Sequence, residues 1–266
     1  MNIPNLLASA IELYDASKFL EAESICYEIL EQDSEHWDAL CLLGMISYKL
    51  NKILPNKIGT LYHLWYYNSQ VWHTTSWAGV TTLKSPSDMW NYQEIIFNLK
   101  PSLVIEFGTC RGGSALFFSS ILREIGHKYK VVSIDVSHEF VSPSVREDSN
   151  IQLVLSSSTS PMVTEIITEL KQNFTGSIFA ILDSDHRKEH VLNEMLLLRP
   201  LLKSGDYLVV EDGNINGHPV LPGWGEGPYE ALQEYFMRYP DDYERDYARE
   251  HKFGFTFATA GFLIRR

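Results

Sequence analysis

Short apolar runs alternate with amphipathic stretches along residues 101–266. The runs have the length and composition of buried β-strands, at 103–107, 130–135, 151–155, 178–183 and 207–211. Between them apolar residues recur with helical spacing, most clearly at 161–172, 187–198 and 228–238. Strands that alternate with helices in this way predict a parallel sheet with right-handed crossovers.

The end of the chain follows a different pattern. Two further strands are expected near 243–250 and 260–265, separated by a turn. Such a pair would form an antiparallel hairpin at one edge of the sheet. The predicted fold class is therefore α/β, with a mostly parallel, Rossmann-like sheet, a C-terminal antiparallel hairpin edge and a small N-terminal α-helical segment.

The N-terminal segment, residues 5–50, is helical in pattern, with a polar turn at 33–36. Ala10 and Gly44 are small residues about one tetratricopeptide-repeat period apart, and Ala22 is small where that repeat packs its two helices closely. The segment thus resembles about one and a half repeats, which is too few to bury a continuous core alone. We expect it to be a helical cap or a homo-oligomer contact. Recruitment of a partner protein is the alternative.

An aromatic-rich stretch follows and leads into the first strand of the sheet. Between residues 55 and 80 it contains Tyr62, Trp65, Tyr66, Tyr67, Trp72 and Trp77. Aromatic side chains at this density usually fill a core or an interface, although a sugar would find stacking surfaces among them. The predicted organisation is a tetratricopeptide-like segment at 1–52, a lid or connecting region at 53–100 and the α/β domain at 101–266.

Composition and charge narrow the classes of function. The 266 residues are 45% apolar, which is typical of a protein with a real core, and the formal net charge is −12. This charge repels nucleic-acid phosphates and anionic membrane surfaces, so we expect neither as a partner. Cys26, Cys41 and Cys110 have neither metal-ligand spacing nor a disulfide pattern, which favours reduced thiols in the cytoplasm. No apolar run has the length of a membrane span, and the N-terminus lacks the positive flank of a signal peptide.

A glycine turn follows the first strand of the sheet, in the stretch PSLVIEFGTCRGGS at 101–114. The apolar run from Leu103 to Phe107 carries Glu106, residues 108–113 form the turn, and Ser114 opens an amphipathic helical run. Glycine lets a ligand approach the backbone closely, and the free N–H groups of a helix N-terminus attract negative charge. The stretch looks like the first motif of class I S-adenosylmethionine-dependent methyltransferases. An ordinary strand-to-helix turn is the alternative.

Acidic residues stand where the other predicted strands end. Asp135 follows the second strand, at the position where nucleotide-binding folds accept ribose hydroxyls. Asp183 and Asp185 follow the fourth strand, and Glu211 and Asp212 the fifth. Because carboxylates that converge in one crevice need a neutralising cation, we expect a hard divalent ion, Mg²⁺ above Ca²⁺ or Mn²⁺. The alternative is that the acids cap the following helices, which we accept for Asp185.

Two histidines lie near these strand ends. His186 comes three residues after Asp183 and can reach the same crevice from the start of the next helix. Its side chain titrates near neutral pH, which suits removal of a hydroxyl proton. His218, in the loop after the fifth strand, is a candidate substrate contact.

Several stretches in one order and spacing resemble the cephalosporin hydroxylase family, which includes rhamnosyl and other sugar O-methyltransferases. They are WAGVTTLKSPSDMWNYQEII, KPSLVIEFGTCRGGSALFF, VVSID, ILDSDHRKEHVLNE, GDYLVVEDGNINGHPVLPGWGEGPYEAL and GFLIRR, which together span about residues 70–266. The resemblance implies a class I methyltransferase fold with S-adenosylmethionine and Mg²⁺ as cofactors. It implies cofactor contacts at Glu106, Gly108, Thr109, Gly112, Ser114, Asp135, Ser157 and Asp183. It also implies metal ligands at Asp183, Glu211 and Asp212, with His186 as general base and Asp183 as a second catalytic residue.

The predicted function is Mg²⁺-dependent transfer of a methyl group to a hydroxyl of a sugar, a glycosylated natural product or a glycan. Candidate substrate contacts are Trp77, Lys84, Tyr92, Gln93 and His218. One alternative is an inactive methyltransferase fold that recruits partners through its N-terminal repeat. Another is a component of cephalosporin-type hydroxylation or methoxylation, although an iron hydroxylase needs two histidines and one carboxylate, which the sequence does not supply.

Overall fold

The computed structural model describes residues 2–50 and 56–266. The chain forms two compact units, residues 1–63 and residues 64–266. The boundary predicted at residue 52 falls within 51–55, outside the described residues. Helix α4 (Asn56–Asn68) runs from the first unit into the second.

The first unit is helical. It contains α1 (Ile3–Asp15), α2 (Phe19–Gln32) and α3 (Trp37–Lys49), and the predicted polar turn lies between the last two. Ala10 and Ala22 are fully buried in its core, as close packing of α1 and α2 requires. Around Gly44, by contrast, no described atom lies within 4 Å of the position of an added Cβ. The likeness to a tetratricopeptide repeat stays a prediction.

The second unit contains a seven-stranded sheet in the order β5-β4-β3-β6-β7-β9-β8. Its strands are β3 (Leu103–Phe107), β4 (Lys130–Asp135), β5 (Ile151–Leu155), β6 (Ile178–Leu182), β7 (Tyr207–Val210), β8 (Tyr243–Arg245) and β9 (Phe262–Arg265). The first five pair in parallel, and β9 is antiparallel to both of its neighbours. The chain reverses its strand order beside β3, where open α/β sheets bind ligands. The predicted fold class is confirmed.

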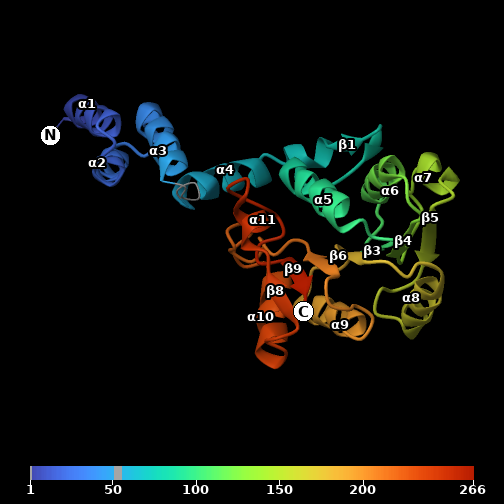
Figure 1. Ribbon diagram of the computed structural model, residues 1–266. Coiled ribbons are helices and arrows are strands. Elements are labelled where there is room, and N and C mark those ends of the chain that lie inside the picture. The colour runs from blue at the N-terminus through green and yellow to red at the C-terminus, as the bar shows by residue number, and fades with distance from the viewer. Residues whose placement is uncertain (1, 51–55) are drawn as a thin grey trace. The chain divides into compact units, whose positions relative to one another are not determined.

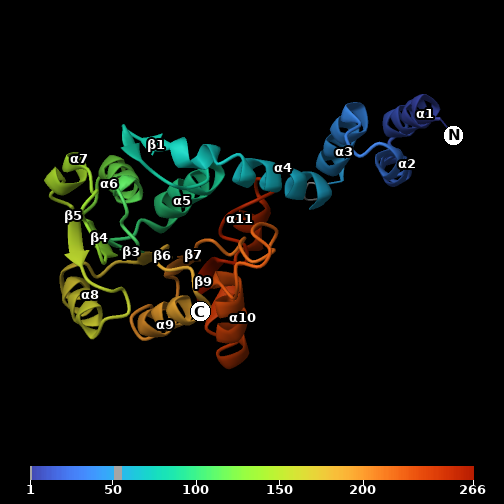
Figure 2. The ribbon, with the colours of Figure 1, turned by 180° about the vertical axis from the view of Figure 1, so that it is seen from behind.

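Helices cover both faces of this sheet (Figures 1 and 2). Helices α5 (Pro86–Leu99) and α6 (Gly113–Ile125) pack on one face, with the short α7 (Pro143–Glu147) beside them. Helices α8 (Pro161–Asn173), α9 (Lys188–Leu198) and α10 (Pro228–Arg238) pack on the other. Every residue of β3 and β6 is buried, because central parallel strands have both faces covered.

The C-terminal edge differs in detail from the prediction. The strand expected at 243–250 ends at Arg245, and a short helix, α11 (Tyr247–His251), takes its second half. Asp246 causes the change because its side chain accepts a hydrogen bond from the backbone N–H of Arg249 and caps the helix. The antiparallel edge is therefore formed by β9 between β7 and β8.

The connecting region also forms structure that the sequence pattern did not predict. A 3₁₀ helix, η1 (Val71–Thr74), precedes a small antiparallel hairpin of β1 (Ser76–Trp77) and β2 (Val80–Thr81). Lys84 follows this hairpin and precedes α5. Among the described residues, no helix is both long and apolar enough to span a membrane.

Candidate functional site

A cavity of about 570 Å³ opens at the carboxyl ends of the central strands. Its polar lining includes Asp135, Ser156, Ser157, Ser158, Asp183, Ser184, Asp185, His186, His190, Glu211 and Asp212. Its apolar lining includes Tyr67, Trp72, Leu83, Ile215, Leu221, Trp224 and Phe257. This volume is typical of small-molecule sites, and the sheet places it at the point where the strand order reverses.

The glycine turn after β3 is held by neighbouring backbone and by Asp135. Gly108 lines the cavity with φ of +97°, and a Cβ added there would lie 1.9 Å from the carbonyl oxygen of Asp183. Asp135 Oδ2 accepts hydrogen bonds from the backbone N–H groups of Thr109 at 2.8 Å and Cys110 at 3.0 Å. The turn is thus a rigid part of the cavity wall.

The other polar groups of the motif lie behind that wall. The Ser133 hydroxyl donates to Glu106 Oε2 at 2.5 Å, and the hydroxyl oxygens of Thr109 and Ser133 are 2.7 Å apart. Burial raises the pKa of Glu106 to about 7, although hydrogen bonds from Ser114 and Ser133 limit the rise. Glu106, Thr109 and Ser114 are buried and support the turn from inside the fold.

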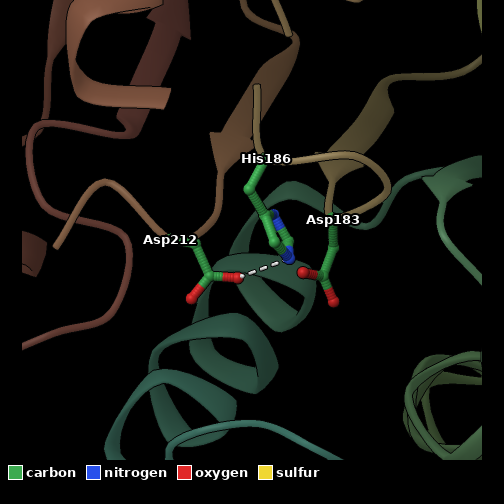
Figure 3. Close-up of side chains that lie close together, drawn as sticks. All are labelled: Asp183, His186 and Asp212. Carbon is green, nitrogen blue, oxygen red and sulfur yellow. Dashed lines mark ion pairs between the residues drawn. The ribbon is translucent and has the colours of Figure 1, made fainter. Parts of the chain in front are cut away.

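Three titratable side chains of the cavity lining converge, as Figure 3 shows. One potential ligand atom from each of Asp183, His186 and Asp212 lies within 4.8 Å of the others. His186 points between the two carboxylates, and its Nε2 is 3.4 Å from Asp212 Oδ2. Asp212 has φ of +54°, a left-handed conformation that is uncommon for a residue other than glycine.

Lys84 and Tyr92 support this group from the protein interior. The Lys84 ammonium donates to Asp183 Oδ2 at 2.6 Å and lies 3.0 Å from Glu211 Oε1. The Tyr92 hydroxyl donates to the same Glu211 oxygen at 2.6 Å. Burial alone would lower the pKa of Lys84, but the carboxylates of Asp183 and Glu211 outweigh it and raise that pKa.

Burial and the closely spaced carboxylates shift the pKa values of Asp212 and His186. Burial raises the pKa of Asp212 to about 7, and Asp183 and Glu211 add to the rise while His186 opposes it. The pKa of His186 is raised because the nearby carboxylates, Asp212 foremost, outweigh its own burial. One cation, Lys84, faces several carboxylates here, so a further cation would be stabilised.

The donor set fits a hard divalent ion. Lys84 engages one oxygen of Asp183 and one of Glu211, and both residues line the cavity. Carboxylate oxygens suit Mg²⁺, whereas a non-haem iron site uses two histidines and one carboxylate. The group of Asp183, His186 and Asp212 instead offers two carboxylates and one histidine. The cavity also has the size, the close glycine turn and the polar strand ends that a nucleoside cofactor requires.

Aromatic residues of the connecting region form one wall of the cavity. The ring centroids of Tyr67 and Trp72 are 5.4 Å apart, and both rings contact Phe257. Phe257 is fixed from behind, because its backbone N–H donates to the buried carboxylate of Asp88 at 2.8 Å. This segment lies far from Phe257 in the sequence, so the sequence pattern alone gave no signal that these three rings meet.

The five predicted substrate contacts lie outside the described lining of this cavity and stay a prediction. Trp77, Lys84 and Gln93 line a second cavity of about 470 Å³ between the β1–β2 hairpin, α5 and α6. Tyr92 is fully buried beneath Glu211. His218 stacks on Tyr229 at 3.8 Å between ring centroids, and its Nε2 lies 3.0 Å from Glu230.

The predicted cofactor contacts divide into two groups. Gly108, Asp135, Ser157 and Asp183 line the cavity. Glu106, Thr109, Gly112 and Ser114 are absent from the described lining, and a Cβ on Gly112 would meet the Val145 side chain at 2.9 Å. Of the predicted metal ligands, Asp183, Glu211 and Asp212 all line the cavity.

His190 is a cavity residue that sequence reasoning missed. Its Nε2 lies 2.9 Å from the Ser158 hydroxyl and 3.2 Å from the buried Glu194 carboxylate. The hydroxyl of Ser184 donates to the same carboxylate at 2.5 Å. The i,i+4 spacing of His190 and Glu194 on α9 was the signal that could have shown their pairing.

Comparisons with known proteins agree with this architecture. The family described as Rhamnosyl O-methyltransferase/CmcI matches residues 69–266. A rhamnosyl O-methyltransferase of Mycobacterium leprae is 56% identical over 226 residues, which cover 85% of this chain and 96% of that protein. One of Mycobacterium tuberculosis (strain H37Rv) is 58% identical over 204 residues, which cover 77% and 83%.

Among solved structures, CmcI with Mg and SAM superposes with a TM-score of 0.58 at 22% identity, over 73% of this chain and 77% of that one. This likeness supports the fold, and the sequence matches support the family. The chain is therefore an enzyme of the rhamnosyl O-methyltransferase/CmcI family.

Proposed function

We propose that the enzyme transfers the methyl group of S-adenosylmethionine to a hydroxyl of a rhamnosyl residue, with Mg²⁺ as a second cofactor. The observation that carries the proposal is the convergence of Asp183, His186 and Asp212 in a cavity that also contains the glycine turn. The names of the mycobacterial relatives support rhamnose as the acceptor. The CmcI structure with Mg and SAM supports the pair of cofactors.

The two ends of the cavity would hold the two cofactors. Gly108, Asp135 and Ser157 surround the end beside β3 and β4 and would bind S-adenosylmethionine. Asp183, Glu211 and Asp212 would hold the ion. When bound, S-adenosylmethionine supplies the methyl group and Mg²⁺ acts as a Lewis acid that lowers the pKa of the acceptor hydroxyl.

His186 would remove the proton from the acceptor hydroxyl. Its Nε2 atom faces the cavity between two carboxylates, and Asp212 lies close enough to hold the ring and stabilise the protonated form. A positioned histidine of this kind contributes typically about 10²–10⁴-fold to a rate.

The aromatic wall would bind the acceptor. Tyr67, Trp72 and Phe257 present apolar ring surface close to the acidic group, and a deoxysugar has an apolar face that packs on such rings. This wall also excludes water from the reacting hydroxyl and fixes its direction, which matters because methyl transfer depends strongly on alignment.

The roles of Asp183 and His186 can be separated by substitution. Asp183→Asn should weaken Mg²⁺ binding, because it removes a charged ligand. His186→Ala should retain Mg²⁺ binding and slow methyl transfer by about 10²–10⁴-fold. Calorimetry measures Mg²⁺ affinity, and labelled S-adenosylmethionine with a rhamnosyl acceptor measures transfer.

Asp185→Asn is the matched control, since Asp185 lies in the same turn but is outside the converging group. It should leave both Mg²⁺ binding and transfer close to the unmodified values. The assignment is wrong if His186→Ala loses Mg²⁺ while Asp183→Asn retains it, since His186 would then be a ligand.

A further inference from the structure

The Lys84 side chain lies directly behind the acidic group and is 4% exposed. Its ammonium contacts Asp183 at 2.6 Å and Glu211 at 3.0 Å, and both of these carboxylates line the cavity. Lys84 comes from the short segment between β2 and α5, whereas the two acids follow β6 and β7. Lys84 is not among the described residues that line the cavity of the acidic group, and its ammonium contacts two carboxylates that do, which points to a role through those carboxylates.

The charges around Lys84 suggest that role. As ligands of a bound ion, Asp183, Glu211 and Asp212 would all be ionised and would together carry three negative charges, whereas Lys84 supplies one positive charge. The resulting net negative charge is balanced by the positive charge of one divalent ion.

We propose that the Lys84 ammonium makes this site favour a divalent ion by neutralising one of its negative charges. It also holds one oxygen of Asp183 and one oxygen of Glu211 on the interior side. The proposal rests on the proposed function, because it assumes that the acidic group binds a metal. Lys84 acts through the ligands and is a positioning residue. Its ammonium occupies the interior side of the carboxylates, which leaves their other oxygens for the cavity.

A measurable consequence follows from the charge of the bound ion. Repulsion between Lys84 and a bound ion grows in proportion to the charge of that ion. Lys84 therefore disfavours a trivalent ion more strongly than a divalent one. Loss of its charge should shift the site's preference toward the trivalent ion, whereas loss of mere packing should weaken the binding of both ions alike.

The test compares Tb³⁺ with Mg²⁺. Tb³⁺ bound in the cavity would be sensitised by Trp72 and Tyr67, so its luminescence reports binding, and Mg²⁺ affinity follows from competition. The quantity of interest is the ratio of Tb³⁺ to Mg²⁺ affinity. Lys84→Met should raise this ratio by at least about tenfold, and Lys84→Arg should leave it within about threefold of the unmodified value.

Tyr92→Phe is the matched control, since it removes the other interior partner of Glu211 without changing charge. It should leave the ratio unchanged. Lys84→Gln is a second neutral variant that keeps a hydrogen-bond donor, in case Lys84→Met fails to fold, and S-adenosylmethionine binding reports folding in each. The proposal is overturned if the neutral variants keep the unmodified ratio, or if Tyr92→Phe raises it as much.

The outcomes also separate this proposal from the proposed function. If the unmodified enzyme binds neither Mg²⁺ nor Tb³⁺, the metal site itself is wrong, and the role of Lys84 is wrong with it. If the unmodified enzyme binds Mg²⁺ and the ratio does not respond to the charge at residue 84, only the role of Lys84 is wrong.

Discussion

Glu106 is the one polar residue of β3, and its carboxyl group points into the fold toward Ser133. It is fully buried, and the charges of Lys84 and Asp183 have opposite effects on its pKa. Through Ser133 it supports the glycine turn from inside the fold, so its ionisation should affect stability, and its predicted cofactor contact stays a prediction.

The pH dependence of stability tests this interpretation of Glu106. Burial raises its pKa in the folded protein to about 7, above the ordinary value of 4.5. The stabilising contribution is thus fully present below about pH 4.5 and is lost as the pH rises through 7. Relative to Glu106→Gln, the unmodified protein should lose up to about 3 kcal/mol of unfolding free energy between pH 5 and pH 8. Urea unfolding of both proteins at the two pH values measures this. An equal difference at pH 5 and pH 8 would contradict the buried, neutral carboxyl group.

The sequence could predict that a residue belongs to the candidate site where its place at the end of a strand determines where it lies in the fold. Asp135, Asp183 and Asp212 were found because parallel strands deliver their carboxyl ends to one edge of a sheet. Trp72 and Phe257 could not be found in this way. Their meeting depends on how the connecting region packs against a loop almost two hundred residues later, which no local pattern encodes.

At the scale of elements, the strand β3 and the helix α6 are joined by a turn in which Gly108 faces protein backbone and Gly112 faces the Val145 side chain. The tight approach at Gly108 is to the Asp183 carbonyl, so this glycine couples the ends of β3 and β6. The prediction explained glycine here by the close approach of a ligand. The structure gives a second reason, because a Cβ at residue 108 would collide with the Asp183 backbone.

Two glycines with positive φ, Gly108 and Gly126, can be substituted to separate backbone strain from steric collision. Gly126 has φ of +81° and open space around it, so Gly126→Ala should cost about 1 kcal/mol through backbone strain alone. Gly108→Ala should cost about 3 kcal/mol or more, because the new Cβ would also collide with backbone that cannot move freely. Chemical denaturation gives both values. Similar costs for the two variants would show that the contact with Asp183 is readily relieved.

Most elements of the sheet could be predicted because buried strands are short, uniformly apolar and bounded by polar residues. The bounds of β3, β4 and β5 match their predictions, and α10 matches as well. The failure at 243–250 has a local cause, since the side-chain cap from Asp246 outweighs the strand-like pattern. Short pieces such as α7 and the β1–β2 hairpin are too brief to produce a periodic signal.

At the scale of the whole molecule, the N-terminal unit contributes no described residue to the cavity lining, which starts at Tyr67. Its helix α3 nevertheless exposes Trp37, Met45 and Tyr48. These positions repeat at helical spacing and give the unit an apolar surface of the kind that interfaces use, while the assembly role stays a prediction.

Truncation tests that prediction. A chain that begins at Asn56 should bind S-adenosylmethionine with an affinity within about threefold of the full chain, because the cavity lining is retained. Its oligomeric state or its solubility should change, because too few repeats are present to bury their own apolar faces. Calorimetry and light scattering after size-exclusion chromatography measure the two properties. An assembly role would be excluded by a truncated chain with the same oligomeric size and solubility as the full one.

The central claim is that one acidic group, Asp183, Glu211 and Asp212 with His186, performs a metal-dependent methyl transfer to a sugar. The most direct measurement is transfer of labelled methyl from S-adenosylmethionine to a rhamnosyl acceptor, with EDTA and after Mg²⁺ is restored. We predict that EDTA abolishes transfer and that added Mg²⁺ recovers it. S-adenosylmethionine binding, measured by calorimetry in the same EDTA solution, should stay largely intact because Asp135 and the glycine turn are not among the proposed ligands of the ion. Full transfer in EDTA would contradict the account.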